Sequence, residues 1–125
     1  MLTNLEIWPK ALPSNKFMEI KQKTIKANGI KFFVQVDGRE VARAYLYILS
    51  NLHKQPFGFM EDVFVAENYR SKGLGTKLVQ ELINAAKQNN CYKLVATSRH
   101  ARPKVHDWYI GLGFKDWGKE FRIDF

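Results

Sequence analysis

The first half of the chain alternates apolar and polar residues with the two-residue period of β-strands. Two segments rich in β-branched and aromatic residues, Ile30–Val36 and Glu40–Leu49, flank the dipeptide Asp37-Gly38. Because this dipeptide favours the tight turns that join antiparallel strands, the pattern predicts a β-hairpin. After a polar loop, a third apolar segment, Phe57–Val65, predicts a further strand.

Beyond residue 73 the pattern changes to the 3.6-residue period of an amphipathic helix. Apolar residues recur on one helical face, at Leu74, Leu78, Val79, Leu82, Ile83, Ala85 and Ala86. This pattern stops at Gln88-Asn89-Asn90, and the segment CYKLVATS, residues 91–98, then predicts a buried strand. The segment Met18–Lys26, before the hairpin, is compatible with either a strand or a helix.

The C-terminal part of the chain predicts a second helix and a last strand. Pro103 suits the first turn of a helix, and Gly111 and Gly113 are typical of its end. Four apolar residues share one face of this helix: Val105, Trp108, Tyr109 and Leu112. Beyond the helix, apolar and charged residues alternate, with Phe121, Ile123 and Phe125 set against Glu120, Arg122 and Asp124. This alternation predicts a last strand whose apolar side chains point inward. The order strand-strand-strand-helix-strand-helix-strand indicates one α/β (α+β) domain over residues 1–125.

The composition fits one compact domain without a membrane anchor. A chain of 125 residues with 46% hydrophobic content can bury a core, and its apolar runs are too short for a transmembrane helix. The N-terminal stretch carries a proline and charges where a signal peptide needs an unbroken apolar run, so we expect a cytoplasmic protein. The single cysteine, Cys91, and three scattered histidines lack metal-binding spacing, and we expect no metal.

The net charge of +8 raises a choice between nucleic acid and a small anion as the partner. Lysines and arginines are scattered along the chain rather than gathered in one arm, which argues against nucleic acid. The turn that contains Arg70 and Lys72 is compatible with a local anion site.

This turn lies between a predicted strand and a predicted helix, an arrangement that presents free backbone N–H groups to a phosphate. Near Gly73 it lacks the Gly-Lys-Ser/Thr ending of a P-loop. It also lacks the third glycine of a dinucleotide fingerprint, because Leu78 stands there, and no acidic residue closes the next strand. Both nucleotide-binding motifs are therefore excluded.

Two motifs resemble those of the GNAT superfamily of acetyl-CoA-dependent N-acetyltransferases. Arg70-x-x-Gly73-x-Gly75 is similar to the family's pyrophosphate loop, and YIGLGF, residues 109–114, is similar to its Tyr-x-x-x-Gly-Phe signature. The resemblance implies a GNAT-type acyl-CoA N-acyltransferase fold, with a mixed, mostly antiparallel central sheet and flanking helices. It also implies transfer of an acetyl group from acetyl-CoA to a primary amine.

The resemblance assigns the cosubstrate contacts to two segments. The pyrophosphate would be bound by the turn residues Arg70, Ser71, Lys72, Gly73, Leu74, Gly75 and Thr76. Gly73 and Gly75 would let the backbone approach closely, and Arg70 and Lys72 would add positive charge. The pantetheine arm would be hydrogen-bonded by the strand residues Val63, Phe64 and Val65. A backbone N–H near Phe64 or Val65 would face the thioester oxygen and stabilise the tetrahedral oxyanion.

Acetyl transfer needs a proton acceptor for the amine and a proton donor for the departing thiolate. Tyr109 matches the family's position for the donor, and its alternative role is that of a core residue on the apolar helix face. Glu61, or else Asp62, is the candidate base. Strand alternation puts Glu61 on the face of Val63 and Asp62 on the opposite face with Phe64, unless a bulge intervenes. Two histidines are further alternatives for the base: His100 and His106.

A narrower resemblance links GFMEDVFVAENYRSKGLG and NNCYKL to the glucosamine-6-phosphate N-acetyltransferases, in which the Glu-Asp pair lies near the substrate. Two features depart from that pattern. Arg102-Pro103 stands where many relatives have an asparagine that contacts the cofactor, and the stretch before the hairpin is short for the helical pair that covers the acceptor site.

An open acceptor site would suit a lysine side chain, a peptide N-terminus, a polyamine or an amino sugar. The rival hypothesis is a non-catalytic module that binds acyl-CoA or nucleic acid on the same fold. The apolar last strand could also pair with a second copy in a homodimer.

Overall fold

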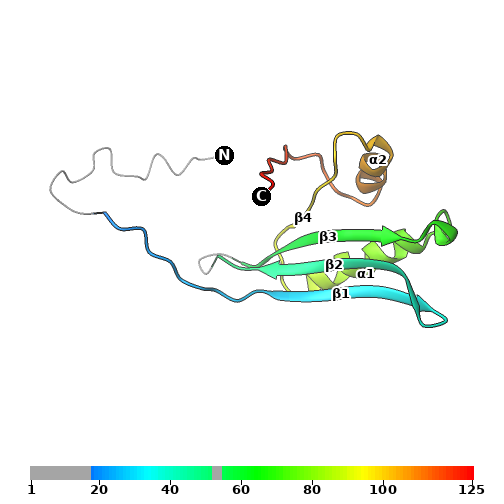
Figure 1. Ribbon diagram of the computed structural model, residues 1–125, viewed down its shortest axis with the longest axis horizontal. Coiled ribbons are helices and arrows are strands. Elements are labelled where there is room, and N and C mark those ends of the chain that lie inside the picture. Colours follow the sequence, from blue (N-terminus) through cyan, green and yellow to red (C-terminus); the bar gives the residue numbers. More distant parts are fainter. Residues whose placement is uncertain (1–17, 52–54) are drawn as a thin grey trace.

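The computed structural model describes residues 18–51 and 55–125. Four strands form one sheet in the order β1-β2-β3-β4, namely β1 (Asn28–Val36), β2 (Arg39–Leu49), β3 (Phe57–Val65) and β4 (Leu94–Ala96). The first three strands pair antiparallel, and β4 pairs parallel with β3 (Figure 1). A 3-10 turn, η2 (Glu67–Tyr69), precedes helix α1 (Leu74–Gln88), and helix α2 (Pro103–Gly111) follows β4. The predicted mixed, mostly antiparallel sheet with flanking helices is confirmed.

The hairpin between β1 and β2 turns at the predicted dipeptide. Asp37 has φ 52° and Gly38 has φ 76°, so both lie in the left-handed region. A type I′ turn requires positive φ at both of its central residues, and its twist matches that of the flanking strands. The prediction of the hairpin from Asp37-Gly38 is confirmed.

Helix α1 covers one face of the sheet (Figure 1). The core between them consists of Ala42, Ala44, Leu46, Met60, Leu78, Val79, Leu82 and Ala86. Because burying a leucine side chain contributes about 1.5–3 kcal/mol, this layer anchors the fold. The helix begins and ends where its apolar period predicts.

The opposite face of the sheet carries the residues that alternate with the core positions. On β2 these are Arg43, Tyr45 and Tyr47, since the residues between them are buried against α1. Tyr45 pairs with Lys31 of β1 and with Glu61 of β3. Lys31, Tyr45 and Glu61 therefore form one row across this face of the sheet, and Glu61 points away from α1.

A β-bulge interrupts β3 at the acidic pair. Arg43 pairs with Phe64 and Tyr45 pairs with Glu61, so one residue of β2 lies opposite two residues of β3, Asp62 and Val63. Asp62 has φ 51°, in the left-handed region. The extra residue resets the alternation, and Val63 packs against the core beside Met60. The alternation expected without a bulge, with Glu61 on the face of Val63, is therefore wrong.

The predicted last strand is also wrong. Residues 112–125 form neither a helix nor a strand, and the side chains expected to point inward are exposed: Phe121 89%, Ile123 79% and Phe125 117%. Alternation produces a strand only where a neighbouring strand supplies hydrogen-bond partners. Within the described residues, this segment has no such neighbour.

The predicted strand over residues 91–98 is present in shortened form, because only Leu94–Ala96 pairs with β3. Its side chains are partly exposed rather than buried. Residues 18–27 form neither of the two elements considered for Met18–Lys26. Within the described ranges, neither helix is long and apolar enough to span a membrane.

Candidate active site

The edge of β3 that faces β4 is paired with that strand along only about half of its length. Residues Gly58, Phe59 and Met60 pair with β4, whereas no further pairs join the two strands, although β3 continues to Val65. Backbone N–H and C=O groups of this second half therefore have no strand partner on the β4 side. Such an edge can accept an extended ligand as if it were another strand.

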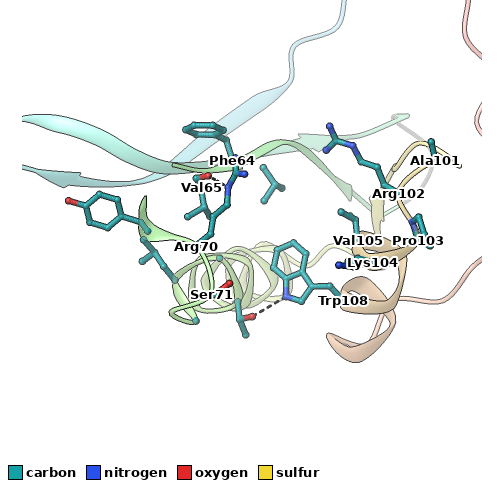
Figure 2. A pocket seen from close by; sticks show the side chains of 16 residues that line it. Phe64, Val65, Arg70, Ser71, Ala101, Arg102, Pro103, Lys104, Val105 and Trp108 are labelled. Atoms are coloured by element: carbon teal, nitrogen blue, oxygen red, sulfur yellow. Dashed lines mark hydrogen bonds between the residues drawn. The ribbon is translucent and has the colours of Figure 1, made fainter. Parts of the chain in front are cut away.

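A pocket of about 860 Å³ opens beside this edge. It is lined by Val63, Phe64, Val65, Tyr69, Arg70, Ser71, Gly73, Leu74, Gly75, Thr76, Ala101, Arg102, Pro103, Lys104, Val105 and Trp108. Figure 2 shows its two walls, with Phe64, Val65 and Arg70 on one side and the start of α2 on the other. The volume falls in the range of pockets that bind small molecules and cofactors.

The N-terminus of α1 borders the same pocket without a side-chain cap. Its N-cap residue, Gly73, makes no side-chain hydrogen bond, and the first intrahelical bond runs from Lys77 N to Gly73 O at 3.0 Å. The first backbone N–H groups of a helix have no partner within the helix, and the helix dipole makes this end positive. The N–H groups of Leu74, Gly75 and Thr76 are thus available to an anion.

The two glycines of the turn, Gly73 and Gly75, are needed there for different structural reasons. Gly73 adopts φ 78°, where an L-residue is strained, and a Cβ added there would meet nothing within 4 Å. Gly75 is needed for space, because an added Cβ would lie 3.3 Å from Val65 Cγ2 and 3.5 Å from the Trp108 ring. Gly73 therefore shapes the turn, whereas Gly75 lets α1 pack closely against β3 and α2.

The basic residues of the turn lie in different places. Arg70 lines the pocket, and its Nε donates to the Val65 carbonyl at 2.7 Å, which ties the turn to the end of β3. Lys72 does not line the pocket, and its Nζ lies 5.7 Å from the centre of the Tyr69 ring. Its contact with a pyrophosphate stays a prediction.

The α2 wall of the pocket was predicted only in part, since Arg102-Pro103 was expected at a cofactor-contact position whereas Lys104 and Trp108 were given no binding role. Arg102 and Lys104 bring positive charge to it, and the cluster RHARPK before the helix was the signal that could have indicated them. Trp108 was assigned only to the apolar face of its helix. Its Nε1 donates to Thr76 Oγ1 at 3.0 Å, a bond that joins α2 to the first turn of α1 (Figure 2).

Tyr109 packs between two other aromatic rings, with centroids 5.4 Å from Trp108 and 5.3 Å from Phe114. Burial raises the pKa of its phenol above the ordinary value, the Glu61 carboxylate raises it further, and Arg102 opposes the rise. Neither Tyr109 nor Glu61 is among the residues that line the pocket, and their roles as proton donor and base stay predictions.

The two neighbouring acids have different surroundings. Asp62 accepts hydrogen bonds from Arg43, Nε to Oδ2 at 2.8 Å and Nη2 to Oδ1 at 3.2 Å, and these bonds lower the pKa of its carboxyl. Glu61 is exposed and has no ion-pair partner among the described residues. A carboxylate engaged by arginine is a weak base, so Glu61 is the freer of the two.

The two histidines considered as alternative bases lie in different surroundings. His106 Nε2 lies 2.7 Å from the Arg99 carbonyl oxygen. A carbonyl oxygen only accepts hydrogen bonds, so Nε2 carries the hydrogen and donates a hydrogen bond to the Arg99 carbonyl oxygen. His100 is exposed in the bend before α2.

Comparison with known proteins identifies the family to which this fold and pocket belong. The family model described as Acetyltransferase (GNAT) family matches residues 2–114, and the chain belongs to that family. The resemblance noted from the pyrophosphate-loop and Tyr-Gly-Phe motifs is confirmed.

Two relatives and two solved structures illustrate the similarity. A glucosamine 6-phosphate N-acetyltransferase of Trypanosoma brucei brucei is 33% identical over 74% of this chain and 63% of that enzyme. An aminoglycoside N(6')-acetyltransferase type 1 of Serratia marcescens is 25% identical over 88% of this chain and 79% of that enzyme. A crystal structure of a Trypanosoma brucei acetyltransferase has a TM-score of 0.68 at 30% identity, covering 79% of this chain and 69% of that one.

The second structure is that of an aminoglycoside N-acetyltransferase in complex with CoA. It has a TM-score of 0.63 at 17% identity and covers 75% of this chain and 64% of that one, which shows the shared fold alone. The present chain spans less than two thirds of the trypanosomal glucosamine enzyme, 63% of its length.

Proposed function

We propose that the chain is an N-acetyltransferase that moves an acetyl group from acetyl-CoA to a primary amine. One observation carries the proposal: the unpaired edge of β3 and the uncapped N-terminus of α1 border the same pocket. The strand edge suits the amide groups of a pantetheine arm, and the helix N-terminus suits a pyrophosphate. Membership of the GNAT family and the names of the two relatives support the same chemistry.

The residues that line the pocket fit this cosubstrate. Backbone N–H groups of Leu74, Gly75 and Thr76 would donate to the pyrophosphate, and the charges of Arg102 and Lys104 would complement it. The pantetheine arm would lie along Val63, Phe64 and Val65, with the thioester near the bulge. A backbone N–H of this segment would stabilise the oxyanion of the tetrahedral intermediate.

The reaction forms a bond between the amine nitrogen and the acetyl carbon and breaks the thioester C–S bond. Glu61, directly or through a water, would take the proton that the amine loses. Tyr109 would give its phenolic proton to the thiolate that leaves, and solvent would restore that proton. The raised pKa of Tyr109 keeps the phenol protonated near neutral pH, although it also makes the phenol a weaker acid. Arg102 acts in the opposite direction and limits this loss.

The acceptor is proposed to be an amine on a small polar molecule. Amino sugars and aminoglycosides are the first classes to test, because one relative is named for glucosamine 6-phosphate and another for aminoglycosides. Mass spectrometry of amines incubated with the protein and acetyl-CoA would test the proposal. The library should contain amino sugars, aminoglycosides, polyamines, and peptides with a free N-terminus or lysine. We expect a gain of one acetyl group that requires both the protein and acetyl-CoA. Absence of product in every class, with acetyl-CoA binding intact, would instead support the rival hypothesis of a non-catalytic acyl-CoA module.

The open face of the sheet gives little support to the alternative in which the protein is a non-catalytic module that binds nucleic acid. Lys31 is paired with Glu40, and Arg43 is paired with Glu40 and Asp62. Cations already engaged by carboxylates contribute less to binding a phosphate backbone.

A homodimer is a further proposal, and it is supported by the exposed apolar side chains of the C-terminal segment, which include Trp117 at 86% exposure and Phe121 at 89%. Light scattering on the protein and on a Phe121→Ser, Ile123→Ser variant would test it. A monomeric protein would contradict it. The single domain over residues 1–125 and the cytoplasmic location stay predictions.

A further inference from the structure

Asp62 adopts a left-handed backbone conformation within a β-strand. Its φ of 51° lies in the left-handed region, at the bulge of β3. Left-handed backbone is uncommon for residues other than glycine, although aspartate tolerates it better than most, and in a strand it persists where surrounding contacts hold it. The question is which contacts hold Asp62 in this conformation.

Arg43, on the neighbouring strand, supplies these contacts. Its Nε and Nη2 donate to the two carboxylate oxygens of Asp62, at 2.8 and 3.2 Å. The guanidinium carbon lies 4.6 Å from the centre of the Phe64 ring, and Nη1 lies 3.5 Å from Glu40 Oε2. Arg43 therefore contacts the residues on both sides of Val63, the other residue of the bulge.

The position of the bulge connects this contact to the proposed reaction. Pairing between β3 and β4 stops at Met60, immediately before Glu61 and the bulge. Val63 and Phe64 line the pocket, whereas Arg43 does not. Arg43 thus lies outside the pocket and contacts the segment of β3 whose backbone would meet the thioester.

We propose that Arg43 is a positioning residue for acetyl transfer: its planar guanidinium fixes the bulge, so that the backbone at Val63 and Phe64 and the Glu61 carboxylate keep their geometry. The inference rests on the proposed function. The geometry needs arginine rather than charge alone, because lysine cannot bond both carboxylate oxygens of Asp62 in one plane while it also contacts the Phe64 ring.

The test compares Arg43→Lys with Arg122→Lys. Arg122 also donates from Nε to an aspartate, Asp124, at 2.7 Å, and this exposed pair lies outside the pocket lining, which makes it a matched control. We expect Arg43→Lys to lower kcat about 10- to 100-fold, since a displacement of about 1 Å at a reacting centre has effects of this size. The dissociation constant for acetyl-CoA should change less than about threefold, because the helix N-terminus and Lys104 are untouched. Arg122→Lys should leave both quantities unchanged.

A purely structural role for Arg43 would lower the melting temperature and leave kcat within twofold of the wild type, and that result would overturn the inference. If Arg43→Lys fails to fold, Asp62→Asn tests the same contact from its other side and should lower kcat. Where both variants fold, the double variant should be no worse than the worse single variant, because both remove one interaction. Additive losses would contradict a shared role.

Amide hydrogen exchange separates this inference from the proposed function. Exchange at Val63 and Phe64 should become at least about tenfold faster in Arg43→Lys, with exchange in α1 unchanged. A wild-type protein that acetylates no amine would overturn the proposed function. Unchanged exchange at Val63 and Phe64 would overturn the role of Arg43, whatever the activity.

Discussion

The two halves of β3 belong to one strand but differ in strand pairing, in burial and in charge. The first half, Phe57–Met60, pairs with strands on both sides and buries Gly58 and Met60 against the core. The second half, Glu61–Val65, pairs only with β2, contains the bulge and carries two exposed acids. The first half is a structural support, and the second half offers the free backbone groups that a site needs. The difference predicts that mutations in the first half affect folding and those around the second half affect binding and turnover.

Met60→Ala should have the largest effect on stability. Met60 is 2% exposed, so its truncation leaves a cavity that costs about 2–5 kcal/mol of unfolding free energy. Chemical denaturation would measure the loss. Ile110→Ala, on a side chain 51% exposed, is the control and should change stability by about 0.5 kcal/mol or less. Equal losses of unfolding free energy in the two variants would contradict the expectation that the buried half of β3 contributes more to stability than the surface does.

Tyr109→Phe should have the largest effect on turnover. The variant keeps the ring packed between Trp108 and Phe114 and removes only the hydroxyl, so kcat should fall about 10²-fold with little change in acetyl-CoA affinity. Steady-state kinetics and calorimetric titration would measure the two quantities. If kcat does not change, Tyr109 is a core residue and the thiolate obtains its proton elsewhere.

Gly73→Val should weaken acetyl-CoA binding at least about tenfold, because a β-branched residue is strongly disfavoured at φ 78° and would distort the start of α1. Calorimetry would measure the dissociation constant. Gly118→Val is the matched control, since an added Cβ there meets nothing within 4 Å and the position has no positive φ. Unchanged affinity in Gly73→Val would refute the pyrophosphate site.

Glu61→Gln should change the pH dependence of kcat more than it changes the maximal value of kcat. The variant removes the proposed base, so the low-pH limb of the kcat profile should disappear. It also removes the charge that raises the pKa of Tyr109, so the high-pH limb should move to lower pH. Asp62→Asn should lower kcat while keeping the low-pH limb, and loss of that limb in this variant alone would transfer the role of base to Asp62.

Added salt should have the smallest effect. Charges at the mouth of an open pocket are screened over about 10 Å at 0.1 M salt, so the acetyl-CoA dissociation constant should rise a few-fold between low and high ionic strength. Titrations at several salt concentrations would measure it. The Arg102→Gln variant should show a shallower salt dependence than the wild type, and an equal slope would exclude Arg102 from the contact.

The sequence predicted the elements whose contacts are local and missed what depends on long-range partners. The Asp37-Gly38 turn and the period of α1 identified the hairpin and the helix, because turn chemistry and helical packing repeat within a few residues. Alternation at Phe121 and Ile123 was misleading, since a strand also needs a neighbour that the sequence does not reveal.

The candidate site was likewise predicted only where it depends on the local sequence. The motif residues Gly73 and Gly75 lie in the predicted turn at the start of α1. The bulge at Asp62 could not be predicted, because it depends on the register against β2 and on Arg43, nineteen positions away. Trp108 was missed for a similar reason, because its bond to Thr76 joins two helices that are distant in the sequence.

We propose that acetyl-CoA binds along the second half of β3 and at the N-terminus of α1. Amide hydrogen exchange with and without acetyl-CoA tests it most directly, because it reports on each backbone N–H of both segments. We predict slower exchange at Phe64, Val65 and the first turn of α1, with no change at Phe59 and Met60. Protection confined to other segments, or no protection under saturating acetyl-CoA, would contradict it.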